Sequence, residues 1–410
     1  MPSTDPKDLD FILNRGISQI IIVDELRALL QEGRPLRLKM GFDPSRPDIH
    51  LGHVVGLRKL RQLQELGHDL VLIVGDWTAQ IGDPSGSSVT RPMLTADEVK
   101  LNAQSYMKQF FKIVDPDKTR AVYQSEWFGD FTLDNVIKLT SMFTVNQFLH
   151  REDFSNRYNA GKPIAITEML YPLLQAYDSI AIDSEVEFGG TDQMFNLLVG
   201  RELQEKMGKR PQQCVMMPIL PGTDGARKMS KSFDNYIGVE ESPTEMFGKI
   251  MSLPDTLIMT YLELLTDIPD HELTEIRVGL ESNSIHPMDM KKHLSREIVN
   301  MFHDPNAAAQ AQAEFELVFQ KKELPVDSPQ FEITPSAEGV ISLDEDSVVV
   351  DLGRFLPGAK LASSRAETKR LLAQGAVEID GQKIGEEKIR IHYGTSIKVG
   401  KRKFLRIVKP

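Results

Sequence analysis

The sequence predicts an α/β fold: a domain on a Rossmann-like parallel sheet, then an α-helical domain, then a small α+β domain. Three observations support this prediction. Residues 37–74 show a strand, a helix and a strand in turn; residues 243–319 are helical in pattern with no strand signal; residues 351–410 combine alternating apolar positions with a basic composition. A chain of 410 residues has room for two or three such domains, and its hydrophobic content of 41% is sufficient for real cores.

The first β-α-β unit begins with a strand expected over residues 37–42. A turn follows, and then a helix from about residue 53 to 66, whose regularly spaced leucines form one buried face. The apolar run 70–74 is short enough for a buried parallel strand. Ligand sites of such sheets lie beyond the carboxyl ends of the strands, so we expect residues 43–53 and 81–86 at that edge.

The remaining elements are predicted from the same periodicities. A helix is expected over 95–111 with a capping box of Thr95 and Glu98, mostly helical chain over 128–178, a strand at 186–188, a helix to Met207 and a strand at 214–217. The predicted domains are 1–235 around the sheet, with a helical insertion, 236–323 helical, and 348–410 as the C-terminal module. Residues 324–347, with three prolines and few aromatics, are expected to be a linker.

Charge is distributed unevenly along the chain. The formal net charge of −11 alone argues against a nucleic-acid binder. Residues 351–410, however, carry 14 Lys and Arg against 6 Asp and Glu, a net of +8 that leaves −19 for residues 1–350. A basic tail on an acidic body predicts that the tail contacts phosphate, and a chance asymmetry of the surface is the alternative.

The cellular location of the protein can be inferred from the lack of long apolar runs and from the cysteine content. No stretch of 18 apolar residues exists and residues 1–5 are polar, so we expect neither a membrane-spanning helix nor a signal peptide. Cys214 is the single cysteine, so an intramolecular disulfide is impossible and a cysteine-based zinc site is not expected. A cytoplasmic protein without membrane partners is the prediction.

A His-Leu-Gly-His motif, His50 to His53, follows the first strand and opens the helix. Backbone N–H groups at a helix N-terminus favour phosphate. Gly52 would let a nucleoside approach the backbone, while His50 and His53 would donate to developing phosphate charge. A metal pair and two purely structural histidines are the alternatives. Because no set of Cys, Asp or Glu completes a metal site, we predict none.

A second motif, Lys-Met-Ser-Lys-Ser over 228–232, lies in a glycine-rich, charged loop. Its ammonium groups, Lys228 and Lys231, could close over a triphosphate and neutralise charge that develops only in the transition state. A solvated pair of lysines is the alternative. Together the two motifs predict an ATP site that works by positioning and charge stabilisation.

These motifs resemble the two signatures of class I aminoacyl-tRNA synthetases, and four further segments resemble the bacterial tyrosyl-tRNA synthetases. The segments are 41–44 (Gly-Phe-Asp-Pro), 81–86, 174–178 and 189–193, and the resemblance runs from about residue 10 to the C-terminus. It implies a tyrosine–tRNA ligase that activates L-tyrosine with ATP to tyrosyl-adenylate and pyrophosphate. The enzyme then transfers tyrosine to the 3′-terminal ribose of tRNA(Tyr).

The resemblance also implies partners and domain roles. Mg²⁺ would accompany ATP, and no tightly bound cofactor is implied. The domain over 1–235 would be catalytic and the one over 236–323 would bind the anticodon. The chain would form a homodimer through a helical interface between residues 125 and 165.

Matching positions in this sequence acquire roles by the same resemblance. Those acting on the phosphates would be His50, His53, Lys228, Lys231 and Arg91. ATP would be bound by Ser45, Gly52, Gly190, Asp192 and Lys231. L-Tyrosine would be bound by Lys39, Gly41, Asp83, Tyr171, Gln175, Asp178 and Gln193. Within this last set, the α-ammonium would contact Asp83, Tyr171 and Gln175, the carboxylate would lie near Gln193, and the phenol hydroxyl would donate to Asp178.

The role of Asp178 also makes independent physical sense. A buried carboxylate that loses its donor is costly, so phenylalanine should be rejected strongly. A structural acid paired with Lys39 is the alternative. Lys39 itself stands where many members carry a tyrosine, as in a second bacterial type, and we hypothesise that its ammonium supports Asp178 or the phenol oxygen. Ser87 replaces a lysine common in the family, so fewer cations would hold the pyrophosphate.

The tail from Leu352 to Gln382 resembles a small RNA-binding module first known from a ribosomal protein (the S-four type). Residues 362–372 are expected to form a short helix with a basic edge, followed by a strand and turn over 375–381. The RNA-binding residues implied are Arg365, Lys369 and Arg370. Contact with the RNA backbone would be guided by shape, and a solvated charged face is the alternative.

Three other functions remain open on the sequence alone. A tryptophanyl-tRNA synthetase shares the fold, but neither the set from Gln175 to Asp178 nor the tail fits it well. A small-molecule nucleotidyltransferase could use the histidine motif but would have no use for the lysine loop. A non-catalytic RNA-binding paralogue would usually lose the signature residues, which are all present here.

Overall fold

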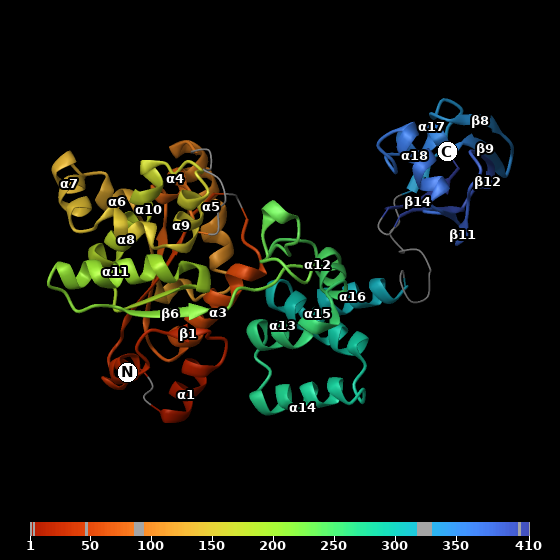
Figure 1. Cartoon of the computed structure of the whole chain (residues 1–410). Helices are drawn as coiled ribbons and strands as arrows, with labels where there is room; N and C mark the ends of the chain where they lie inside the picture. The colour runs from red at the N-terminus through yellow and green to blue at the C-terminus, as the bar shows by residue number, and fades with distance from the viewer. Residues whose placement is uncertain are drawn as a thin grey trace. The chain divides into compact units, whose positions relative to one another are not determined.

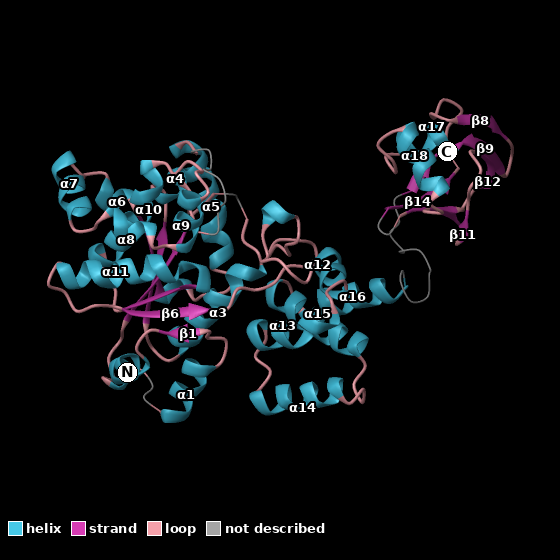
Figure 2. Cartoon of the chain, in the orientation of Figure 1, coloured by secondary structure: helices cyan, strands magenta, loops and turns pink. Residues whose placement is uncertain are grey.

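The computed structural model describes residues 2, 5–45, 48–85, 94–317, 330–400 and 403–409. The chain divides into two compact units, residues 1–308 and 309–410 (Figure 1). Figure 2 shows that the first unit surrounds a central sheet with helices, whereas strands dominate the second.

The N-terminal unit is organised around a six-stranded sheet of order β1-β6-β5-β2-β3-β4. Its strands are β1 Gln19–Ile20, β2 Arg37–Phe42, β3 Asp69–Val74, β4 Thr119–Tyr123, β5 Val186–Gly190 and β6 Gln213–Met217. Strands β2 to β6 run parallel and β1 is an antiparallel edge strand, which confirms the predicted parallel sheet. β1 and β4 were not predicted, because β1 has two residues and β4 buries only Val122.

The strand order reverses between β2 and β5. β3 and β4 follow on one side of β2, while β5 and β6 lie on the other. β2 pairs with β3 along its whole length but with β5 only at Leu38↔Val186 and Lys39↔Glu187. The two central strands therefore separate toward their carboxyl ends. Such a switch point is where α/β sheets open a ligand crevice.

Helices cover the sheet of this unit. They are α1 Pro6–Asn14, α2 Val23–Gln31, α3 Leu51–Glu65, α4 Thr78–Ile81, α5 Ala96–Phe110, α6 Ser125–Phe128, α7 Leu133–Ser141, α8 Val145–Leu149, α9 Glu152–Asn159, α10 Ile166–Ala181 and α11 Met194–Lys206. The predicted capping box of Thr95 and Glu98 starts α5. In α3, Leu57, Leu60 and Leu63 are buried as the leucine spacing predicted, and the helix starts two residues earlier than expected because His50 caps it.

The region predicted to be helical packs into the same unit. It contains α12 Pro243–Met251, α13 Ile258–Leu265, α14 Asp270–Glu281, α15 Pro287–Phe302 and the start of α16 Pro305–Phe315, within which the second unit begins at residue 309. Arg15, just after α1, donates to the backbone oxygens of Glu263, Thr266 and Ile268 at the end of α13. These bonds satisfy carbonyls that a helix end leaves open. Among the described residues, no helix is long and apolar enough to cross a membrane.

The C-terminal unit is an α+β module. Its elements are β7 Gln330–Glu332, β8 Val340–Leu343, β9 Ser347–Asp351, α17 Leu352–Gly358, α18 Arg365–Ala373, β10 Val377–Ile379, β11 Gln382–Lys383, β12 Lys388–His392, β13 Ser396–Val399 and β14 Lys403–Val408. They build sheets of order β11-β10-β13-β14-β7 and β12-β9-β8. The predicted helix and strand correspond to α18 and β10.

The predicted linker over 324–347 is wrong for residues 330–347. β7 and β8 lie within it, and residues 324–329 fall outside the described part of the chain. β7 pairs in parallel with β14, whose Ile407 lies opposite Phe331. A partner so distant in sequence leaves no local pattern, so a short polar strand was mistaken for a linker.

Candidate active site

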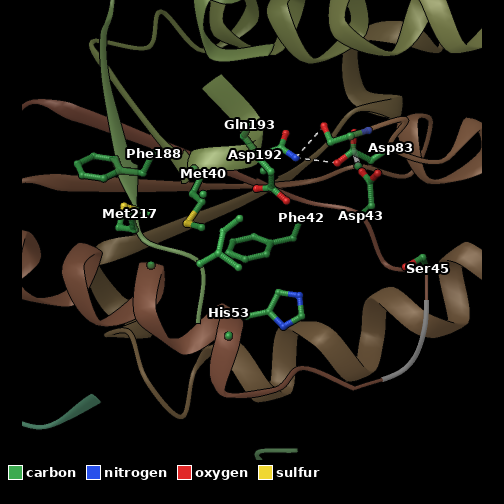
Figure 3. Close-up of a pocket in the computed structure, with 18 of the residues that line it drawn as sticks. Met40, Phe42, Asp43, Ser45, His53, Asp83, Phe188, Asp192, Gln193 and Met217 are labelled. Atoms are coloured by element: carbon green, nitrogen blue, oxygen red, sulfur yellow. Dashed lines mark hydrogen bonds between the residues drawn. The ribbon is translucent and has the colours of Figure 1, made fainter. Parts of the chain in front are cut away.

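A cavity of about 390 Å³ opens where β2 and β5 separate (Figure 3). This volume is within the range of small-molecule sites. The predicted residues that line it are Gly41, Ser45, His50, Gly52, His53, Asp83, Tyr171, Gln175, Asp178, Gly190, Asp192, Gln193, Lys228 and Lys231. Lys39 lies behind the lining, and Arg91 and Ser87 lie outside the described residues. The fold thus brings the histidine motif, the lysine loop and the segments of the family resemblance to one place.

The histidine motif forms the N-terminus of α3. The Gly52 N–H donates to His50 Nδ1 and the His50 N–H donates to His53 Nδ1, each over 3.2 Å. Burial lowers the pKa of His50 well below its usual value and that of His53 to about 4, so both rings are neutral at pH 7. A neutral ring that accepts at Nδ1 carries its proton on Nε2. Both rings therefore have an Nε2–H left to donate to a ligand.

Glycine at position 52 is required by this arrangement. A Cβ there would lie 2.9 Å from His50 Nδ1 and 3.7 Å from the Met229 Cβ. A side chain would thus displace the capping ring and narrow the space between α3 and the lysine loop.

The lysine loop lies against the same cavity and its two ammonium groups contact acidic residues. Lys228 Nζ lies 3.1 Å from Asp192 Oδ2. Lys231 Nζ lies 2.6 Å from the Asp48 backbone oxygen and 3.1 Å from its Oδ2. The pair of Lys228 and Asp192 is partly exposed, and Lys231, although its side chain is only 10% exposed, is paired with an Asp48 side chain that is 45% exposed. Ion pairs with a solvent-exposed partner exchange that partner at little cost. Both lysines are thus placed where a polyphosphate could replace their carboxylate partners.

Two glycines of the lysine loop, Gly222 and Gly225, lie too close to other residues to carry a side chain. A Cβ at Gly222 would lie 2.2 Å from Asn235 Nδ2, and one at Gly225 would lie 2.6 Å from Pro254 Cγ. Gly225 also has a φ of +80°, which residues with a Cβ rarely adopt. These positions therefore fix the shape of the loop that carries Lys228 and Lys231.

Asp178 lies at the buried end of the cavity and is 1% exposed. Its Oδ2 accepts from Gln124 Nε2 over 2.9 Å, while its Oδ1 is buried with no hydrogen-bond partner among the described residues. Desolvation raises the pKa of Asp178 to about 7, although the charge of Lys39, the hydrogen bond from Gln124 and the nearby indole of Trp127 oppose the rise. A buried acceptor without a donor is costly, so the site is suited to a ligand hydroxyl.

Gln124 is a functional residue that the sequence analysis missed. Its Oε1 accepts from the backbone N–H groups of Trp77 and Thr78, over 3.2 and 2.9 Å. These bonds force Nε2 toward Asp178 and so hold that carboxylate in place. The only signal was the position of Gln124 directly after β4, a strand that was itself not predicted.

Acidic and phenolic groups line another wall of the cavity, where Figure 3 shows Asp43, Asp83 and Gln193. Tyr171 donates to Asp43 Oδ2 over 2.9 Å, and Gln193 Nε2 donates to Asp83 Oδ2 over 2.7 Å. Burial raises the pKa of Tyr171 well above its usual value, so its hydroxyl remains a donor. Asp43 was quoted only as part of a motif, yet its carboxylate belongs to this wall. Two carboxylates here favour a cationic group on the ligand.

Lys39 makes no hydrogen bond or ion pair with Asp178, but its positive charge lowers the pKa of Asp178 and so supports the ionised carboxylate, as hypothesised. The fully buried Nζ lies 3.0 Å from Glu187 Oε1 and donates to the Gln175 backbone oxygen and Ser179 Oγ. Lys39 on β2 and Glu187 on β5 are register partners, so their side chains leave the sheet on the same face. Strand register decided this pairing, and a sequence reveals register only after the sheet order is known.

The three basic residues predicted in the tail lie on or at the start of α18 in the C-terminal unit. Arg365 approaches Asp351 and Glu387, Lys369 also approaches Glu387, and Arg370 approaches Glu367. All three basic side chains are at least half exposed, so these ion pairs are weak and open to competition by phosphate.

A family model and individual relatives of known function match this chain and agree with each other. The family described as "tRNA synthetases class I (W and Y)" matches residues 31–320. A tyrosine–tRNA ligase of Dehalococcoides mccartyi is 54% identical over 400 residues, covering 98% of each chain. The tyrosine–tRNA ligase of Thermotoga maritima is 48% identical, again covering 98% of each chain.

Solved structures share the fold at low sequence identity. A truncated mitochondrial tyrosyl-tRNA synthetase of Aspergillus nidulans matches with a TM-score of 0.65 and 20% identity, covering 76% of this chain and 94% of its own. The tyrosyl-tRNA synthetase of Archaeoglobus fulgidus, solved with L-tyrosine, matches with a TM-score of 0.61 and 24% identity, covering 74% and 98%.

Proposed function

Since this chain belongs to the class I tRNA synthetases of the tryptophan and tyrosine type, we propose that it is a tyrosine–tRNA ligase working in the cytoplasm through the residues of this cavity. The observation that carries the proposal is one cavity lined by the histidine motif and the lysine loop, together with the buried Asp178, whose Oδ1 has no donor among the described residues. ATP, entering as its magnesium complex, would occupy the first part and the tyrosine side chain the second.

The activation step requires positioning and charge stabilisation. The tyrosine carboxylate attacks the α-phosphorus of ATP, its P–O bond forms as the bond to pyrophosphate breaks, and tyrosyl-adenylate results. The Nε2–H groups of His50 and His53 donate to the phosphate oxygens as charge develops, while Lys228 and Lys231 neutralise the departing pyrophosphate. Asp192, next to Gly190, then exchanges its bond to Lys228 for the ribose hydroxyls.

Tyrosine recognition divides between the two ends of the cavity. The phenol hydroxyl donates to Asp178 Oδ1, which satisfies the acceptor that lacks a donor. The α-ammonium lies near Asp83, Tyr171 and Gln175, where carboxylates and oxygen acceptors line the wall. Gln193 is placed for the side of the ligand that carries the carboxylate. This orientation directs the reacting carboxylate toward the phosphates.

The second step transfers tyrosine to RNA. The 3′-terminal ribose hydroxyl of tRNA(Tyr) attacks the tyrosyl carbonyl and AMP leaves. We assign anticodon binding to the helical region that begins near residue 236, and RNA-backbone contact to Arg365, Lys369 and Arg370 of the C-terminal module. Incubation with ATP, labelled tyrosine and tRNA should give acid-precipitable label. Periodate-oxidised tRNA, which lacks the ribose diol, should give none, and labelling independent of that diol would contradict the proposal.

Binding of tyrosine should release protons near neutral pH. In the free protein the pKa of Asp178 is raised to about 7, and a donating phenol favours the ionised carboxylate. Tyrosine affinity should therefore rise about tenfold between pH 6 and pH 8, because that range spans the ionisation. The two motif histidines do not titrate there, since burial lowers the pKa of each. Calorimetry in buffers of different ionisation heat measures the release, and proton uptake would contradict the assignment.

The homodimer is proposed to form through the helical insertion. Large apolar side chains are exposed on α7 to α10, namely Leu133, Ile137, Val145, Tyr158 and Ile166. Monomers rarely expose so many apolar side chains on neighbouring helices unless the surface binds a partner. Figure 1 shows these helices gathered in the yellow to olive part of the N-terminal unit.

Replacing Leu133 by aspartate should weaken the dimer by at least about 100-fold, because a symmetric interface contains the change twice. Leu133 is 74% exposed and begins α7, where an acidic residue suits the helix dipole and leaves the fold intact. Light scattering after gel filtration gives the mass. The matched control is Leu101→Asp on α5, 70% exposed, which should remain dimeric. Equal behaviour of the two variants would place the interface elsewhere.

A further inference from the structure

A network of buried polar groups lies directly behind Gln175, which lines the cavity where the α-ammonium of tyrosine is proposed to bind. Glu187, 1% exposed, accepts at Oε1 from Lys39 Nζ over 3.0 Å and from Gln175 Nε2 over 3.1 Å. At Oε2 it accepts from Ser179 Oγ over 3.2 Å and from Gln212 Nε2. A carboxylate has about four acceptor positions, so this one is saturated.

The other members of the network fix the direction of its hydrogen bonds. The Lys39 ammonium has three N–H donors, and it uses them on Glu187, the Gln175 backbone oxygen and Ser179 Oγ. Ser179 receives a bond from Lys39 and can therefore direct its own proton to Glu187. An ionised carboxylate cannot donate, so every neighbour must present a donor to it. Gln175 has only one way to do so, which is through its Nε2.

The orientation of the Gln175 amide follows from this network. Its nitrogen faces Glu187, so its carbonyl oxygen is the end that a ligand in the cavity meets. A freely rotating amide would offer either end, and an NH₂ group would repel an ammonium. Fixing the amide ahead of binding removes that uncertainty and lowers the entropic cost of binding.

We infer that Glu187, held by Lys39, is a positioning residue that fixes the Gln175 amide with its oxygen toward the cavity and so selects ligands that carry an ammonium group. The inference rests on the proposed function, since it takes L-tyrosine as the ligand. It gives Lys39 a role different from the one hypothesised from the sequence: the lysine acts through Glu187 and Gln175, at the ammonium end of the ligand.

The test compares two ligands that differ only in the ammonium group. L-Tyrosine and 3-(4-hydroxyphenyl)propanoate, which lacks that group, are titrated into the full-length protein and into Glu187→Gln, and the dissociation constants are measured by equilibrium dialysis. A glutamine at 187 has one acceptor end in place of two, so Lys39 and Gln175, which both donate to Oε1 in the unmodified protein, compete for its carbonyl oxygen and the Gln175 amide is no longer fixed. Tyrosine binding should weaken by roughly 10- to 100-fold, the loss expected for a hydrogen bond to a charged group, while binding of the propanoate stays unchanged.

Matched variants separate orientation from loosened packing. Ser179→Ala removes another donor of the same buried carboxylate but leaves the bond between Gln175 and Glu187, so its preference for tyrosine over the propanoate should match that of the unmodified protein. Lys39→Met combined with Glu187→Gln removes both charges, keeps the volume similar, and should lose the preference as Glu187→Gln does. If Glu187→Gln does not fold because Lys39 has lost its charged partner, the double variant takes its place in the test.

Each outcome decides the question. Loss of the preference in the two Glu187 variants and its retention in Ser179→Ala supports the inference. Equal weakening of both ligands, or an unchanged preference, would overturn it and leave Glu187 with a structural role. Failure of the unmodified protein to bind tyrosine at all would instead contradict the proposed function.

Discussion

Replacing Lys231 by alanine should slow tyrosyl-adenylate formation by about 10²- to 10³-fold while the dissociation constant of tyrosine stays nearly constant. The ammonium of Lys231 donates to the backbone oxygen and the carboxylate of Asp48, two residues before the histidine motif. Its charge matters most when pyrophosphate leaves, so its loss raises the barrier and spares ground-state binding of tyrosine.

Single-turnover kinetics measure this effect directly. Formation of tyrosyl-adenylate is followed in the absence of tRNA, and tyrosine binding is measured separately. Arg227→Ala is the matched control on the same loop, because that guanidinium is paired with Asp224, stacks over Phe233 and does not line the cavity. It should change the rate little. A loss of tyrosine affinity in Lys231→Ala, with an unchanged rate at saturation, would contradict the role assigned to the lysine loop.

Changing Asp178 to asparagine should lower kcat/KM for tyrosine by roughly 10- to 100-fold and lower the preference over phenylalanine by nearly the same factor. Strong rejection of phenylalanine is an established property of tyrosine-activating enzymes, so the prediction concerns the residue that produces it. Gln124 already donates to one oxygen of residue 178, and an asparagine would direct its NH₂ group at the phenol. The kcat/KM for phenylalanine, which has no hydroxyl, should fall much less.

Stability gives an independent check on the same variant. The pKa of Asp178 in the folded protein is raised to about 7, above that of an unfolded aspartate. The folded state therefore holds the proton more tightly, and its stability falls as pH rises between those two values. Asp178→Asn removes this cost, so its Tm should exceed that of the unmodified protein at pH 8 and the difference should shrink toward pH 4. A lower Tm at pH 8 would mean that the carboxylate has a structural role.

The parts of the fold that depend on local pattern could be predicted from the sequence. The strand at 37–42 and the capped helix at 96–110 follow from periodicity and capping residues, and the convergence of the two signature motifs was inferred from their residue types and the family resemblance. The contact of Lys39 with Glu187 could not, because it depends on the register of two strands that are far apart in sequence. β7 was missed for a similar reason, since its partner β14 lies near the end of the chain.

In the candidate site, too, some residues could be predicted from local motifs and others could not. The residues that face the ligand stand in recognisable motifs, whereas the groups that hold them do not. Gln124 and Glu187 fix Asp178 and Gln175 from behind, through hydrogen bonds whose direction is set by backbone N–H groups or by a saturated carboxylate. Such supporting residues become visible only when the donors and acceptors around each buried group can be counted.

The most direct test of the proposed function is amino-acid-dependent exchange of pyrophosphate into ATP, without tRNA, with tyrosine, phenylalanine and tryptophan tested separately. We expect exchange with tyrosine alone, because only its phenol hydroxyl satisfies Asp178 while its carboxylate reaches the phosphates. Exchange with tryptophan or phenylalanine in place of tyrosine would contradict the assignment of Asp178. No exchange with any of the three, in folded protein, would contradict the catalytic function itself.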